Sequence, residues 1–115
     1  MKYMILIHSG VALEEALGNG VGAELQQTHG AIIGELQRSG EFLDTSELAT
    51  AGAKVVRTGE GLAITDGPYA ETTEWVGGYY LLDCATIERV VEIAGRFVEA
   101  RYGAVEIRPL VEHVD

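Results

Sequence analysis

The sequence predicts an α+β domain, a β-α-β-β-α-β sandwich with an extra β-hairpin, and three observations lead to this prediction. Two long segments, 24–39 and 86–102, carry apolar residues at helical spacing. Short apolar runs typical of strands stand before, between and after these segments. Two further runs flank a glycine-containing loop, as in a hairpin. The 115 residues, without linker or internal repeat, fit one domain, 1–115.

The chain begins with a predicted buried strand. Lys2 to Ile7 is a short apolar run that ends at His8. In a regular strand, His8 lies on the same face as Met4 and Leu6. It is therefore either a polar strand end or a group that binds a ligand in a pocket. The next segment, Leu13 to Leu17, makes a turn or two of helix.

Residues 24–39 are predicted as the first long helix, and Gly40 ends it as a left-handed cap. One continuous stripe along the helix contains Leu25, His29, Ile32, Ile33 and Leu36. His29 is unusual there, because a buried imidazole needs a polar partner. It is either a core histidine with its hydrogen bonds satisfied or a functional group.

The middle of the chain predicts a strand and then a hairpin. Phe42 to Thr45 is the strand. The runs Val55–Arg57 and Leu62–Ile64 flank the loop Thr58–Gly61 and form the hairpin. Arg57 lies near the open side of this hairpin. It is either a solvated surface residue or a donor to the carboxylate of a ligand.

The stretch Thr65 to Asp83, TDGPYAETTEWVGGYYLLD, is the segment around which we expect the site to form. Asp66-Gly67-Pro68 is typical of a turn, because Pro68 fixes its own φ and biases the residue before it. Asp66 either accepts backbone N–H groups in this turn or stands at the mouth of a pocket. Tyr79–Leu82 is apolar on both alternating faces, which predicts a central strand covered on two sides.

The end of the chain predicts a second helix and a last strand. Thr86 caps the helix, which ends near Tyr102-Gly103. Its apolar stripe consists of Ile87, Val90, Val91, Ala94, Phe97 and Val98. Residues 104–108 form the last strand, which Pro109 limits to a sheet edge or a strand end. This order of elements is the ferredoxin-like plan, with two helices on one sheet face.

The apolar pattern also predicts a homodimer. Two helices cover only one face of the sheet, but Met4, Leu6 and the run Tyr79–Leu82 place apolar side chains on both faces. The simplest cover for the second face is another copy of the chain, related by a two-fold axis.

Two motifs in the central segment resemble a known signature. TDGPYAET at 65–72 and GGYYLLD at 77–83 resemble the DGPF domain, part of the YCII-related family, which most often has Phe where Tyr69 stands. The resemblance extends to MKYMILIH at the start, to LQRSGEF at 36–42 and to GAVEIRPL at 103–110. It implies a ferredoxin-like α+β domain that dimerises into a shared α+β barrel. The activity of the family is largely undefined.

The resemblance implies a catalytic role for His29, because the family commonly carries a histidine on this helix with an aspartate as its partner. That aspartate sits in an Asp-Pro step, which this chain lacks, and Asp66 is our candidate replacement. The first hypothesis is a small metal-independent enzyme that moves protons through His29 and Asp66, with isomerase or lyase chemistry on a small organic molecule. The substrate-binding candidates are Tyr69, His8, Tyr80 and Arg57.

The alternative is a non-catalytic ligand-binding or regulatory accessory module. DGPF-type domains are similar to accessory proteins of sigma factors, which implies a link to transcription regulation through a protein partner. The two hypotheses predict different surroundings for His29. Catalysis needs a pocket open to solvent beside the imidazole, whereas a module has a sealed imidazole and an exposed apolar patch elsewhere.

Composition excludes several other classes of function. Eighteen acidic and eight basic residues give a formal net charge of −10, which disfavours nucleic acid and anionic membranes as partners. No window approaches the ~20 apolar residues of a membrane span, so we expect a cytoplasmic protein. His8, His29 and His113 lack the spacing of a metal site, and we expect no metal. No nucleotide or flavin motif is found, so we expect no cofactor, and the single Cys84 is expected to be buried and inert.

Overall fold

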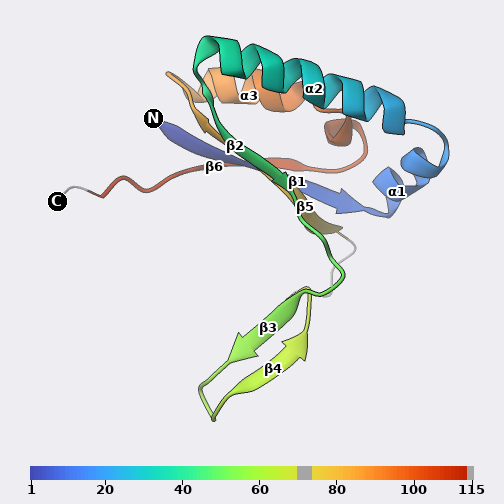
Figure 1. The fold of residues 1–115 in the computed structure, drawn as a ribbon, viewed down its shortest axis with the longest axis vertical. Coiled ribbons are helices and arrows are strands. Elements are labelled where there is room, and N and C mark those ends of the chain that lie inside the picture. Colours follow the sequence, from blue (N-terminus) through green and yellow to red (C-terminus); the bar gives the residue numbers. More distant parts are fainter. Residues whose placement is uncertain (70–73, 114–115) are drawn as a thin grey trace.

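A four-stranded antiparallel sheet carries two helices on one face in the computed structural model, which describes residues 1–69 and 74–113 (Figure 1). The strands lie in the order β2-β5-β1-β6. Their bounds are Lys2–Gly10 for β1, Phe42–Glu47 for β2, Glu74–Asp83 for β5 and Val105–Pro109 for β6. The covering helices are α2 (Gly22–Ser39) and α3 (Ile87–Gly95). This arrangement confirms the predicted ferredoxin-like α+β sandwich.

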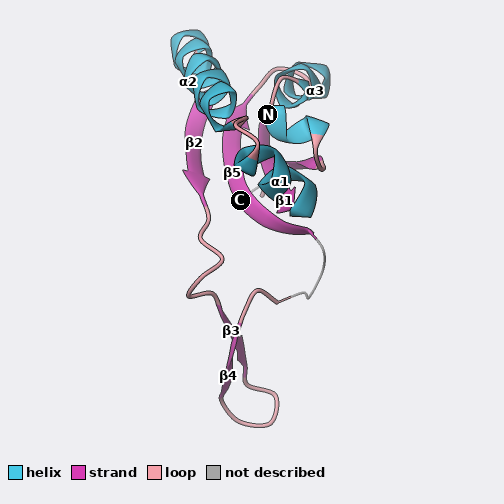
Figure 2. Ribbon diagram, turned by 90° about the vertical axis from the view of Figure 1, so that its right-hand side faces the viewer, coloured by secondary structure: helices cyan, strands magenta, loops and turns pink. Residues whose placement is uncertain are grey.

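The remaining elements lie at the end of the sandwich or project from it. The short helix α1 (Val11–Gly18) follows β1, and the 3₁₀ helix η1 (Val98–Arg101) follows α3. The strands β3 (Lys54–Arg57) and β4 (Ala63–Asp66) pair only with each other in the described structure. Figures 1 and 2 show this hairpin extending well away from the four-stranded sheet.

The hydrophobic core lies between the sheet and the two covering helices. On β1, Tyr3, Ile5 and Ile7 alternate with less buried residues and face the helices. The cluster also contains Ile32, Leu36, Tyr80, Leu82, Cys84, Val90, Ile93, Ala94 and Phe97. Each large apolar side chain buried there contributes roughly 1.5–3 kcal/mol relative to full exposure.

Local signals in the sequence are confirmed at several boundaries. Gly40 has a φ of 82°, the left-handed cap expected at the end of α2. The Arg89 N–H donates to Thr86 Oγ1 at 3.2 Å, which caps α3 as predicted.

The single cysteine, Cys84, is buried, as expected. Burial raises the pKa of Cys84 to about 11, which keeps this thiol in its unreactive protonated form.

The predicted end of the second helix is wrong. We expected the helix to continue to Tyr102-Gly103, but α3 ends at Gly95. The backbone becomes extended at Phe97, with ψ of 134°, and then enters η1. The change of direction rotates the residues after Phe97 away from the positions they would occupy on a continuous helix.

The sheet face opposite the helices is partly apolar and has no cover within the described protomer (Figure 1). Met4, Leu6 and Leu81 alternate with the buried residues of their strands and are only half-buried. Two polar pairs lie beside them: His8 with Glu106 at 3.0 Å, and Tyr79 with Asp44 at 2.8 Å.

An ion pair between the covering helix α3 and the loop after α2 predicts an acid-sensitive contribution to stability. Arg89 donates to both carboxylate oxygens of Glu41, at 3.0 Å and 2.9 Å. These hydrogen bonds hold the pKa of Glu41 at about 2, below its ordinary value of 4.5. Because the pKa is lowered in the folded state, the stabilisation is present above pH 4.5 and is lost as the pH falls towards 2.

We expect Arg89→Ala to lower the free energy of unfolding by about 1–2 kcal/mol at neutral pH, after allowance for solvent screening. This difference in the free energy of unfolding between parent and variant should shrink as the pH falls from 4.5 towards 2. Over this range Glu41 becomes protonated first in the unfolded state and then in the folded state. Urea unfolding at neutral and acidic pH measures both effects. Arg96→Ala is the matched control, because its pair with Glu35 is more exposed and should contribute little. An equal loss at both pH values would contradict the role of Glu41.

Candidate functional site

The candidate site is a cavity of about 680 Å³ between the sheet and the first two helices. Its lining comes from α1, the first half of α2, the ends of β1 and β2 with the loop that follows, β5, and η1. Apolar side chains of the helices, including Leu13, Leu17 and Leu25, make up part of the wall. The volume is typical of sites that hold a small organic ligand.

A hydrogen-bonded chain of three side chains borders this cavity. His29 Nδ1 lies 2.5 Å from the hydroxyl of Tyr80, and His29 Nε2 lies 2.7 Å from Glu99 Oε2. His29 comes from α2, Tyr80 from the helix-facing side of β5, and Glu99 from η1. Phe97 packs against both rings, with its centroid 4.9 Å from each of theirs. The site is thus joined to the hydrophobic core.

The protonated phenol of Tyr80 fits one assignment of the hydrogen bonds among these three side chains. Burial raises the pKa of Tyr80 well above its ordinary value, the negative charge of Glu99 raises it further, and a hydrogen bond with Thr45 acts against both. The phenol therefore keeps its proton and can donate it to His29 Nδ1. A neutral imidazole with an acceptor at Nδ1 carries its proton on Nε2, which donates to Glu99.

Glu99 is the most buried charged residue of the described chain, with 8% of its side chain exposed. Its Oε2 accepts from His29, while its Oε1 is buried and has no hydrogen-bond partner among the described residues. A carboxylate in this position fixes the orientation of the imidazole. It also stabilises the imidazolium that forms when His29 takes up a proton.

The structure brings two of the predicted site residues together, His29 and Tyr80, but it does not bring Asp66 to them. Asp66 is the last residue of β4, and its side chain is 85% exposed. Its carboxylate accepts from Lys54 Nζ at 2.5 Å across the hairpin. Because the hairpin extends away from the sandwich (Figure 1), the carboxylate that contacts His29 in the protomer is Glu99.

The other three predicted binding residues also lie outside the 680 Å³ cavity. The guanidinium carbon of Arg57 stands 5.2 Å from the centroid of the Tyr69 ring, and 74% of Tyr69 is exposed. Tyr69 therefore packs against Arg57 of the hairpin strand β3. His8 lies on the open sheet face, where it pairs with Glu106.

Sequence reasoning missed Glu99, and periodicity carries no signal for it. On a continuous helix, Glu99 falls on the side away from the stripe that contains Phe97 and Val98 and would face solvent. The extended backbone at Phe97 and the tighter turn of η1 direct it inwards instead. Gly95 offers the one local hint, because glycine often marks the end of a helix.

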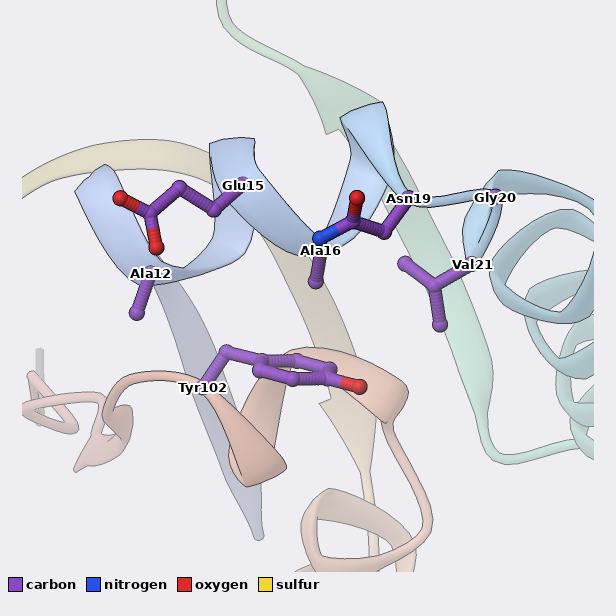
Figure 3. A pocket seen from close by; sticks show the side chains of 7 residues that line it. All are labelled: Ala12, Glu15, Ala16, Asn19, Gly20, Val21 and Tyr102. Carbon is purple, nitrogen blue, oxygen red and sulfur yellow. The ribbon is translucent and has the colours of Figure 1, made fainter.

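A second hollow, of about 520 Å³, lies between α1 and the ring of Tyr102 (Figure 3). Glu15 and Asn19 contribute its polar side chains, and the rest of its lining is Ala12, Ala16, Gly20 and Val21. None of the predicted site residues lines this hollow. We therefore place the candidate site in the larger cavity.

Within the described ranges 1–69 and 74–113, no three His, Cys, Asp or Glu side chains are grouped as ligands for a metal ion. None of the helices in these ranges combines the length and apolar content needed for a membrane crossing.

Comparison with known proteins gives two matches along nearly the whole chain. The model of the YCII-related domain matches residues 1–113. An uncharacterized protein of Rhizobium meliloti (strain 1021) is 28% identical over 114 residues, which are 96% of this chain and 92% of that protein.

Proposed function

The chain belongs to the YCII-related domain family, and from this premise we propose that it is a small metal-independent enzyme with acid/base chemistry of the isomerase or lyase type. One observation carries the proposal: the chain Glu99–His29–Tyr80 borders a cavity large enough for a small organic molecule. A carboxylate, an imidazole and a phenol joined by hydrogen bonds are groups that can carry out proton transfer.

Each of the three hydrogen-bonded residues Glu99, His29 and Tyr80 has a distinct proposed role. The substrate replaces the Tyr80 hydroxyl at His29 Nδ1, and His29 removes a proton from a carbon next to a carbonyl group. Glu99 stabilises the resulting imidazolium through Nε2. Tyr80, freed from the imidazole, donates its hydrogen bond to the oxygen on which negative charge develops. The raised pKa of Tyr80 suits a donor, because the phenol stays protonated.

Deuterium exchange tests this chemistry without a known substrate. The protein is incubated in D₂O with a panel of small ketones, 2-oxo acids and keto-amines, and loss of the α-proton signal is followed by ¹H NMR. We expect exchange in at least one compound and a reduction of about 10²-fold or more in His29→Asn. No exchange in any compound, or full exchange in His29→Asn, would contradict the proposal.

Asp66→Asn is the matched control for this experiment. Its side chain is exposed and does not line the cavity, so we expect unchanged exchange. A loss equal to that of His29→Asn would instead make Asp66 of a second copy the carboxylate that acts on His29.

We also propose that the chain forms a homodimer. Two surfaces of the protomer support this: the half-buried apolar residues on the open sheet face, and the projecting hairpin. Val56, Leu62 and Ile64 of the hairpin region are each more than half exposed, at 58%, 72% and 59%. A second copy that covers the open face and receives the hairpin removes both from water.

A second candidate function is a non-catalytic accessory module that binds a ligand or a protein partner. The exposed apolar residues of the hairpin favour it, since they offer a docking surface that is not part of the cavity lining. The exchange experiment separates the two candidates, because a module turns over none of the panel compounds.

A further inference from the structure

We propose that the cavity bordered by His29 selects small organic cations, amines or quaternary ammonium compounds, over anions of the same size. The inference rests on the proposed function in one respect, that this cavity is the ligand site. It goes beyond that function because it assigns the charge of the ligand.

The charged side chains that line the cavity are all acidic apart from the imidazole. Glu14 from α1, Glu47 from β2 and Glu99 from η1 contribute carboxylates from three separate elements. None of its described lining residues is a lysine or an arginine. An anion that enters the cavity therefore meets like charges from several sides, with no cation to bind it.

Four of the eight basic residues of the chain pair with acidic partners away from the cavity. Arg89 pairs with Glu41, Arg96 with Glu35, Arg101 with Glu24 and Lys54 with Asp66. These pairs lie outside the cavity lining, so they leave its carboxylates uncompensated. The net charge of −10 on the whole chain adds a field of the same sign.

Glu99 also lacks a hydrogen-bond donor at one of its two carboxylate oxygens, a position that an ammonium group of a ligand can fill. Only 8% of its side chain is exposed, and Oε1 has no hydrogen-bond partner within the described part of the chain. Native proteins rarely leave such an acceptor unsatisfied. Because a positive charge in the cavity interacts with this carboxylate through a medium of low dielectric constant, it stabilises the site more than a surface ion pair would.

The uncharged lining fits the hydrocarbon part of an organic cation. Leu13, Leu25 and Ile33 supply apolar surface from the two helices, and Trp75 lines the cavity from the start of β5. Indole faces attract alkylammonium groups through the quadrupole of the ring. A cation with an attached apolar group therefore matches both components of the lining, whereas a hydrated metal ion matches only one.

The test compares three probes that share a ring and differ in charge: benzylammonium, benzyl alcohol and benzoate. Binding is followed through the ¹⁵N–¹H shifts of Gly77 and Gly78, whose backbone borders the cavity. We expect benzylammonium to bind about tenfold more tightly than benzyl alcohol, and benzoate not to shift these amides. Raising the salt from about 0.02 M to about 0.5 M should weaken benzylammonium binding and leave benzyl alcohol unchanged.

Two double variants separate the effect of the cavity carboxylates from the effect of the net charge of the protein. Glu14→Gln/Glu47→Gln removes two cavity carboxylates and should abolish the preference for the cation. Glu60→Gln/Glu88→Gln removes the same charge from exposed positions outside the cavity and should retain it. Equal binding of benzoate, or equal loss in both variants, would overturn the inference. In either case, proton exchange by His29 is measured separately and decides the proposed function by itself.

Discussion

Replacing Phe97 by Ala is expected to lower the free energy of unfolding by about 3–5 kcal/mol, the largest single effect that the structure predicts. The side chain of Phe97 is 1% exposed and is among the largest that are fully buried in the described chain. It contacts the rings of both His29 and Tyr80, so its loss leaves a void directly behind the candidate site. Urea or thermal unfolding measures the change.

The control for Phe97 is Val91→Ala on the preceding helix. Val91 is 56% exposed, so we expect its truncation to change the free energy of unfolding by no more than about 0.5 kcal/mol. Because Phe97→Ala is expected to be poorly folded, Phe97→Leu provides the functional measurement. It keeps most of the apolar volume but loses the ring contact, and we expect a folded protein with slower proton exchange at His29. A loss below about 1 kcal/mol in Phe97→Ala would contradict the packing described for this residue.

The fold was predictable because its elements carry strong periodic signals. The stripe of α2 repeats over several turns, so it identifies both the helix and its buried face. The continuous apolar run of β1 identifies the strand, although not which of its two faces meets the helices. Caps at Gly40 and Thr86 then mark the ends where local chemistry decides them. The end of α3 carries only a weak marker, Gly95, and the apolar stripe continues through Phe97 and Val98 although the helical backbone does not.

The candidate site was predictable only in part. His29 and Tyr80 each attract attention as polar groups within apolar elements, and the faces of α2 and β5 that bury them meet in the core. Their third partner, Glu99, depends on the break at Phe97 and has no signature of its own. Asp66 shows the opposite case. The Asp-Gly-Pro motif was recognisable in the sequence, but the local sequence pattern does not determine the direction in which the hairpin projects from the sheet.

The projecting hairpin leads to the second large effect, a change in oligomeric state. The segment 54–69 is electrically neutral, because Lys54 and Arg57 balance Glu60 and Asp66, so the rest of the chain carries the net charge of −10. Two such chains repel each other over most of their surface, and the neutral apolar hairpin is where contact costs least. We therefore expect the parent protein to be a dimer of 12.3 kDa chains.

Removal of the hairpin should convert this dimer into a monomer. The four-stranded sheet and its helices should keep the secondary structure that they have in the parent protein. Ala53 O accepts from Gly67 N–H at 2.8 Å, so the base of the hairpin is already closed and two glycines can replace residues 54–66. The mass is measured by light scattering after size exclusion at about 50 µM protein, at low and high salt, since screening of the net charge should favour the parent dimer.

The variant Leu6→Glu places a charge on the open sheet face, and its mass is measured by the same light-scattering experiment. If the hairpin deletion stays dimeric while Leu6→Glu is monomeric, the sheet face alone forms the interface. A monomeric parent would remove the dimer altogether, and the exposed Val56 and Ile64 would then need a different protein as their partner.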